Sequence, residues 1–184
     1  MLALALLAPG CASYQYRHLM PGKFEGKVTV TWVEPNLFIY EPDPVTPLTY
    51  TAASGRKLVP TKMYTDGGSI PPFLWGVPGY SPWGYAPAYI IHDWLFEAHH
   101  CSYPGQGDTA FTESAELLAE GIKTLMESGK VPKDEFVEFS IYEAVSSSVA
   151  KNLWDNGACN PPAEVMGPKA ATGRRVIFTL DMGK

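Results

Sequence analysis

The sequence has few charges and no cluster of basic residues. Only 18% of its 184 residues are charged, and the formal net charge is −5. A basic patch is the usual mark of a nucleic-acid-binding protein, so we expect no nucleic-acid partner. The length suits one globular domain. Proline and glycine, 17 of each, fall mostly outside the stretches with helical periodicity, which indicates long structured loops.

The apolar run near the start is far too short for a transmembrane helix. Residues 2–8 match instead the hydrophobic core of a secretory signal. Cys11, which follows, lies where a bacterial lipobox carries its lipidated cysteine. We therefore expect a lipoprotein-type signal segment over 1–11 and a single α+β domain over 12–184, and Ala12 favours an outer-membrane anchor facing the periplasm. A stable anchor of this kind needs several acyl chains. The alternative is an apolar N-terminus with an incidental cysteine.

Cysteine is rare, with three in the chain. Apart from Cys11, only Cys101 and Cys159 remain, and an exported compartment permits a disulfide between them. Such a bridge would close a loop of about 60 residues and contribute roughly 4 kcal/mol in the chain-entropy model. Two separate buried thiols are the alternative.

The first third of the chain has β-strand patterns. Residues 24–32 alternate, with Val28, Val30 and Trp32 on one face. Further strands are expected at 37–40, 48–52 and 57–63, with a turn at Ser54-Gly55, and a last strand at 176–180 returns to this sheet.

From Ala86 onward the apolar period becomes helical. We expect helices over 86–100, 109–128 and about 132–154, the first of them central because it is apolar nearly all round. The predicted fold class is therefore α+β: a small N-terminal antiparallel β-sheet, a three-helix unit and a C-terminal strand. The apolar stripe of the third helix comprises Phe136, Phe139, Tyr142, Val145, Val149 and Leu153.

His92 and Asp93 lie inside the apolar first helix. Ionisable groups among buried apolar residues are costly unless they are paired, hydrogen-bonded or bound to a metal. Helical neighbours point about 100° apart, so each residue needs its own partner. Asp108, beyond the following turn, is the natural partner to orient His92 as a general base. Asp93 is then free to bind a divalent cation such as calcium or magnesium.

Asp66 is a second candidate metal ligand. It precedes Gly67 and Gly68, which permit positive φ angles and a close approach of the backbone to an ion. Each candidate has a structural alternative: a tight turn for Asp66, a helix N-cap for Asp108, and a satisfied core histidine for His92. The sequence has no His-Glu-x-x-His zinc motif.

Three blocks of residues resemble a known family. They are the turn Thr65–Pro71 (TDGGSIP), the helix Ala88–Phe96 (AYIIHDWLF) and the helix start Asp108-x-x-Phe111. The same blocks occur in this order in the bacterial and phage family of domain of unknown function 1353, and the resemblance is expected to span about Phe24 to Trp154. Family members usually carry Ala-Asp-Arg where this chain has Gly-Asp-Thr around Asp108. The family implies no established activity.

A looser analogy links the chain to secreted phospholipases of the A-two type. Those enzymes also carry His-Asp on one helix and a second Asp on the antiparallel helix. The analogy implies that His92 activates water, Asp93 binds calcium and Asp108 orients the histidine. This chain lacks that family's flanking cysteine pairs and its Gly-rich calcium loop.

These features favour a cell-envelope lipoprotein with a hydrolase-like site and a lipid or cell-wall substrate. His92 and Asp108 are the expected catalytic residues, and Asp93 and Asp66 the expected metal ligands. The main alternative is a non-catalytic envelope or phage-related structural protein, in which His92, Asp93 and Asp108 form a buried polar staple. An inhibitor or immunity lipoprotein with a protein partner is a third hypothesis.

Overall fold

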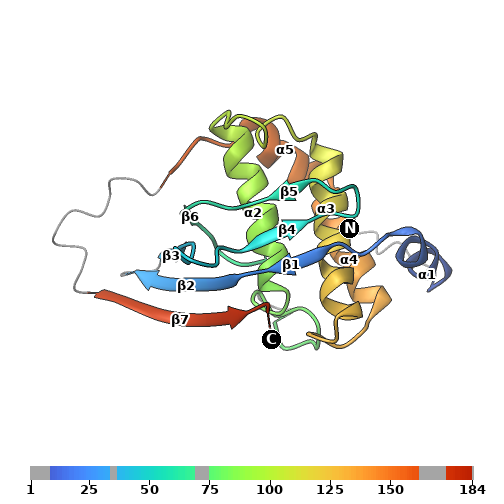
Figure 1. Ribbon diagram of the computed structural model, residues 1–184. Helices are drawn as coiled ribbons and strands as arrows, with labels where there is room; N and C mark the ends of the chain where they lie inside the picture. Colours follow the sequence, from blue (N-terminus) through green and yellow to red (C-terminus); the bar gives the residue numbers. More distant parts are fainter. Residues whose placement is uncertain (1–8, 34–36, 69–74, 162–172, 184) are drawn as a thin grey trace.

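The computed structural model describes residues 9–33, 37–68, 75–161 and 173–183. Helices α2 and α3 lie behind the strands in Figure 1, and α1 lies at one edge. Among the described helices, none is long and apolar enough to cross a membrane. The elements in chain order are α1 (Pro9–His18), β1 (Lys23–Glu25), β2 (Lys27–Val33), β3 (Leu37–Tyr40), β4 (Thr49–Thr51), β5 (Lys57–Leu58), β6 (Met63–Tyr64), α2 (Ala86–His100), α3 (Phe111–Glu127), α4 (Glu135–Val145), α5 (Ser148–Asn156) and β7 (Arg174–Asp181).

The strands form two antiparallel sheets, which confirms the α+β class. The strand orders are β1-β4-β5 and β6-β3-β2-β7, so the C-terminal strand does return to pair with β2. The single strand expected over 24–32 is two strands in different sheets. Gly26 separates them with a φ of +85°, and a Cβ at this position would overlap the backbone of Pro47.

A register shift in β2 corrects the predicted face of this strand. Val28 and Val30 are buried as expected, but the next buried residues are Thr31 and Val33, and Trp32 is only partly buried. The pairing with β7 shifts between Val30 and Thr31. Val30 pairs with Phe178 and Thr31 with Val176, so the extra residue of this bulge, Ile177, lies in β7.

The strand expected over 57–63 is also divided. Its ends form β5 in one sheet and β6 in the other. Pro60 lies between them, and proline has no N–H to continue a β-ladder. The division brings β6, and Tyr64 at its end, beside β3.

The first two predicted helices are present, and the third is wrong as a continuous element. Helix α2 has the predicted bounds, and α3 begins two residues later than expected. The third is two helices, because Asp134 caps α4 and Ser147 caps α5 through a bond from the Ala150 amide. The break changes the phase of the apolar stripe, and Phe136, Val149 and Leu153 are exposed.

Helix α2 lies at the centre of the core. Nine of its residues are buried, which matches its nearly continuous apolar surface. It packs against α3 and α5, while α1, which the sequence analysis did not predict, packs against α4. Helix α2 also places His92 and Asp93 in the lining of a cavity.

Candidate functional site

A cavity of about 430 Å³ lies between α2 and the α4–α5 pair. Helix α2 contributes His92, Asp93, Phe96, Glu97 and His100. Tyr64, at the end of β6, also lines it. The remaining wall is formed by α4, the α4–α5 connection, α5 and the segment after it, and it comprises Ala144, Val145, Ser147, Val149, Ala150, Leu153, Gly157 and Ala158.

His92 lines this cavity with an unsatisfied ring nitrogen. Its Nε2 atom is buried and has no hydrogen-bond partner among the described residues. The ring packs against Phe96, with centroids 5.0 Å apart. Burial lowers the pKa of His92 from 6.5 to about 4, because the interior disfavours the charged form. His92 is therefore neutral at physiological pH and has a nitrogen free to bind a ligand.

Asp93, unlike the His92 ring nitrogen, has a hydrogen-bond partner among the described residues. Its Oδ2 accepts a hydrogen bond of 2.7 Å from the Thr65 hydroxyl. Burial, together with the nearby charge of Asp66, raises the pKa of Asp93 well above its usual value, although the Thr65 bond opposes the shift. Two close carboxyl groups of this kind are the oxygen ligands that hard divalent cations prefer.

A second cavity, of about 380 Å³, adjoins the first. Asp66, Asp93 and Thr65 line it together with Tyr64 and two residues of β3. Asp93 and Tyr64 line both cavities. The structure thus brings the two predicted metal ligands to one place, next to the cavity of His92.

The two glycines after Asp66 hold this turn against α2. Gly67 has a φ of +77°, and a Cβ there would overlap the carbonyl oxygen of Pro82. A Cβ on Gly68 would lie 2.6 Å from the ring of Tyr89 on α2. Any larger side chain would push Asp66 and Thr65 away from Asp93. The rest of the TDGGSIP block, residues 69–71, lies outside the described residues.

The structure does not bring Asp108 to His92. Asp108 is exposed in the loop between α2 and α3, and it lines neither cavity. It is not the cap of α3 either, since the capping position is Ala110. In the described part of the chain no hydrogen bond joins Asp108 to His92, so the order of residues shared with phospholipases does not carry their geometry.

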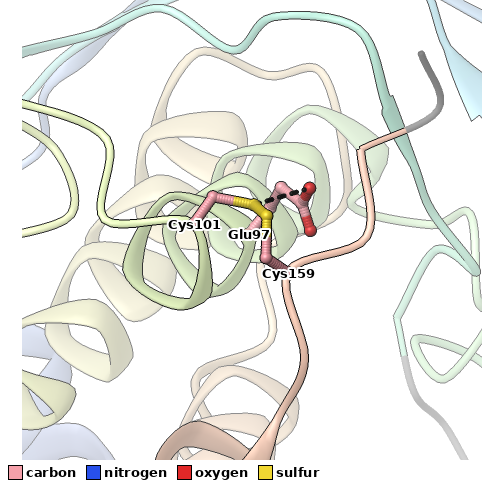
Figure 2. Close-up of side chains that lie close together, drawn as sticks. All are labelled: Glu97, Cys101 and Cys159. Atoms are coloured by element: carbon pink, nitrogen blue, oxygen red, sulfur yellow. Dashed lines mark hydrogen bonds between the residues drawn. A yellow bond between two sulfur atoms is a disulfide. The ribbon is translucent and has the colours of Figure 1, made fainter.

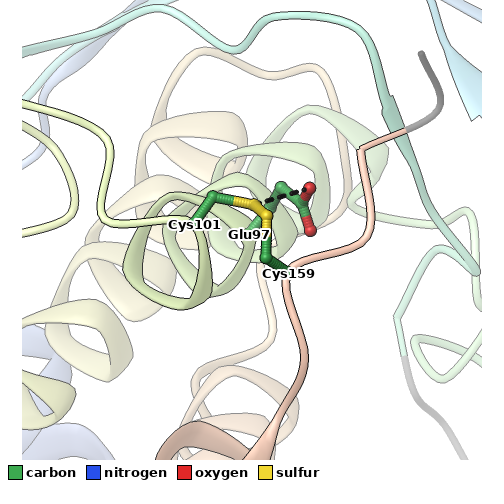
Figure 3. The surroundings of a disulfide bond; sticks show 3 residues. All are labelled: Glu97, Cys101 and Cys159. Carbon is green, nitrogen blue, oxygen red and sulfur yellow. Dashed lines mark hydrogen bonds between the residues drawn. A yellow bond between two sulfur atoms is a disulfide. The ribbon is translucent and has the colours of Figure 1, made fainter.

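A disulfide ties the segment that carries two cavity-lining residues, Gly157 and Ala158, to the end of α2. Cys101 and Cys159, whose pairing the sequence left open, are joined, with their Cα atoms 4.6 Å apart (Figure 2). Glu97 Oε1 lies 3.3 Å from the Cys101 sulfur (Figure 3). Burial raises the pKa of Glu97. Because the disulfide sulfurs carry no proton and are not thiolates, this cluster does not supply the ligands of a zinc site.

Two histidines fix α5 against the end of α2. His100 donates from Nε2 to the carbonyl oxygens of Leu153 and Trp154, at 3.2 and 3.0 Å. The His99 ring stacks on Trp154 with centroids 4.2 Å apart. Gly157 touches the His100 ring so closely that a Cβ would overlap it. These contacts hold the α5 wall of the cavity in place.

The comparisons with known proteins identify one part of the chain. Residues 45–124 match the family model described as "Protein of unknown function (DUF1353)". Over this segment the chain is similar to the DUF1353 family, as the three blocks of residues predicted. The match contains all three blocks on which the resemblance rested, but it begins later and ends earlier than expected. No curated protein and no solved structure matched the chain.

The DUF1353 segment covers only one side of the cavity. It includes Asp66, His92 and Asp93, whereas α4, α5 and Cys159 lie beyond it. The sequence analysis missed this second wall because it placed Val145, Val149 and Leu153 in the core. The Ser146-Ser147-Ser148 run was the available signal, since serines compete for backbone hydrogen bonds and favour helix caps.

Proposed function

We propose that this chain is a cell-envelope hydrolase, with a lipid or cell-wall substrate, whose reaction takes place where the two cavities meet. The single observation that carries this proposal is the buried Nε2 of His92, which lines a cavity and has no hydrogen-bond partner among the described residues. A buried polar atom without a hydrogen bond costs about 1–3 kcal/mol. A bound water or substrate would satisfy it.

His92 acts as the general base in this proposal. Its neutral ring accepts a proton from water, and the water oxygen forms a bond to the scissile carbonyl carbon. The tetrahedral intermediate then collapses, the bond to the leaving group breaks, and His92 returns the proton to that group. Asp108 has no part in this sequence, since it is exposed and distant from the cavity lining.

Asp93 and Asp66 would hold a calcium or magnesium ion. The ion supplies polarisation of the scissile carbonyl when bound. The support is the raised pKa of Asp93, part of which comes from the charge of Asp66. A cation between the carboxylates would relieve their repulsion.

The proposed envelope location rests on Cys11. Its thiol is exposed on α1. Ala12, the next residue, is buried, and the Ser13 hydroxyl donates a 2.6 Å bond to Glu135 on α4. A lipid on Cys11 would therefore hold the domain directly at the membrane surface, in our proposal the outer membrane facing the periplasm.

The test is ester hydrolysis by the full chain in saturating calcium, with p-nitrophenyl acetate, a phospholipid and a cell-wall muropeptide as substrates. We expect His92→Gln to lower kcat/KM at least about 100-fold, the usual contribution of a general base. Because the base must be unprotonated and its pKa is about 4, the wild-type profile should stay flat down to about pH 5 and fall near pH 4.

His18→Gln is the matched control, because His18 is exposed on α1 and lines neither cavity. This variant should keep wild-type kinetics. If His92→Gln is as active as wild type on every substrate that is hydrolysed, or if no substrate is turned over, the proposal is wrong and the non-catalytic alternative stands.

The metal is tested separately by thermal unfolding. Calcium or magnesium should raise the unfolding temperature of wild type, by a stabilisation of about 2.7 kcal/mol at 100 times the dissociation constant. Asp93→Asn should remove the rise. Asp155→Asn should keep it, since Asp155 lies on the surface in an ion pair with Lys151. An equal response of the two variants would exclude a cation on Asp93.

A further inference from the structure

We infer that the cavity between α2 and α5 holds the single acyl chain of an uncharged ester. This inference rests on the proposed hydrolytic site and names its substrate class. The sequence left both a lipid and a cell-wall substrate open, and the side chains that line the cavity favour the lipid. The acyl chain lies along α4–α5, and the ester carbonyl lies at His92.

The two walls of the cavity differ in chemistry. The α2 wall carries the ionisable side chains His92, Asp93 and Glu97. The wall facing it is apolar except for Ser147. Pockets of about 300–1,000 Å³ with an apolar lining and a few polar groups are typical small-molecule sites, and the polar groups orient the ligand. A ligand with one polar end and one apolar end fits this division.

The apolar wall favours an acyl chain over a glycan or peptide. Val149 and Leu153 on α5 line the cavity and are 71% and 58% exposed, so neither is a core residue. Large apolar side chains left exposed beside a cavity mark a binding surface. A cell-wall sugar or peptide would need hydrogen-bond partners here, and the helical wall offers only the Ser147 hydroxyl as a side-chain partner.

The charge of the lining favours an uncharged ester over an anionic lipid. Asp93 and Glu97 line the cavity, and neither lysine nor arginine does among the described residues. An anionic head group would therefore meet no lysine or arginine in the described lining. An additional negative charge would be repelled and would lose its hydration without compensation.

The cavity has a limited volume. Gly157 and Ala158 line it, and the disulfide at Cys159 ties this segment to the end of α2. The volume of about 430 Å³ limits the length of the acyl chain that the cavity can hold. Affinity should rise as the acyl chain lengthens and then stop rising once the cavity is full.

The experiment measures displacement of the neutral fluorophore N-phenyl-1-naphthylamine from the full chain by monoacylglycerols. From monobutyrin to monooctanoin, each added methylene should tighten binding about two- to fourfold, as burial of a methylene predicts. Sodium octanoate should bind at least about tenfold more weakly than monooctanoin. A dissociation constant that does not depend on chain length, or octanoate binding as tightly as monooctanoin, would overturn the inference.

Val149→Glu and Val45→Glu form a matched pair. Both valines are largely exposed, at 71% and 84%, and only Val149 lines the cavity. Val149→Glu should weaken monooctanoin at least about fivefold, while Val45→Glu should stay within about twofold of wild type. Equal shifts would contradict the placement of the chain along α5.

His92→Gln separates this inference from the proposed function. If the variant binds monooctanoin like wild type but p-nitrophenyl acetate is not hydrolysed even by wild type, the hydrolase proposal fails and the acyl site remains. If p-nitrophenyl acetate is turned over but binding shows no chain-length dependence, the acyl site fails and the hydrolase proposal remains.

Discussion

The molecule has two clusters of buried polar groups, and the hydrogen bonds of only one of them are largely satisfied. The first joins α1 to α3. Lys123 Nζ donates to the carbonyl oxygens of Tyr16 and Leu19, at 2.5 and 2.8 Å, and lies 4.4 Å from the centroid of the Tyr16 ring. The Tyr16 hydroxyl in turn donates to Glu127. Every bond here fixes one element to another, so this cluster has the features of a structural staple.

The second cluster is His92 and Asp93. Asp93 has the Thr65 hydroxyl, and His92 Nε2 has no partner among the described residues. No hydrogen bond joins His92 to Asp93 or Asp108 in the described structure. The staple hypothesis required these contacts, so the comparison favours a site that a ligand completes.

Glu138 shows that an unsatisfied atom does not by itself mark a site. Its two carboxyl oxygens are fully buried and also lack partners in the described part of the chain. The pKa of Glu138 is raised to about 7, mainly by burial and against the attraction of Lys123. Glu138 lies beside the staple, whereas His92 lines a cavity. The cavity is therefore the feature that distinguishes the two regions.

The largest expected effect is the loss of the Lys123 bonds. Lys123→Met should destabilise the fold by about 3 kcal/mol, because the carbonyl groups of Tyr16 and Leu19 lose a buried donor. Lys23→Met is the matched control, since Lys23 is 69% exposed in its ion pair with Glu25, and surface pairs contribute about 0–1 kcal/mol. Urea unfolding at neutral pH measures both. Equal losses would remove the distinction between a staple and a surface pair.

Glu138→Gln should have a smaller effect of opposite sign. The folded protein binds a proton at Glu138 up to about pH 7, whereas the unfolded chain releases it near 4.5. The stabilisation from this proton is therefore complete below about pH 4.5 and is lost as the pH rises through 7. Between pH 5 and pH 8, the difference in unfolding free energy between Glu138→Gln and wild type should therefore shift in favour of the variant by about 1–3 kcal/mol. A difference that does not change with pH would contradict a buried carboxyl group.

The sequence predicted α2 itself better than the contacts that other segments make around it. The bounds of α2 follow from a continuous apolar run, and the Asp66 turn follows from Gly67 and Gly68. These are local signals, and each needs no knowledge of distant residues. The fold class and the return of the last strand to β2 were also predictable from periodicity.

The missed features depend on contacts between distant segments. The spacing between His92 and Asp108 suits an antiparallel return, but it cannot show that the loop leaves Asp108 in solvent. The placement of α5 depends on the stacking of His99 on Trp154 and on the disulfide. The bulge in β7 likewise arises from its pairing with β2, a strand about 150 residues away in the chain.

The claim that His92 belongs to a ligand site is tested most directly by the urea unfolding of His92→Phe from pH 4 to 8. Of the three variants, this one should change the stability least. The pKa of His92 is lowered from 6.5 to about 4 in the folded state, so wild type should lose stability as the pH falls from about 6.5 to 4. Phe removes the unsatisfied nitrogen and the titration. We predict that this variant matches or exceeds wild type at pH 7.5, within about 1 kcal/mol, and lacks that acid loss. A loss of several kcal/mol at pH 7.5 would show that His92 is a structural staple and would contradict the account.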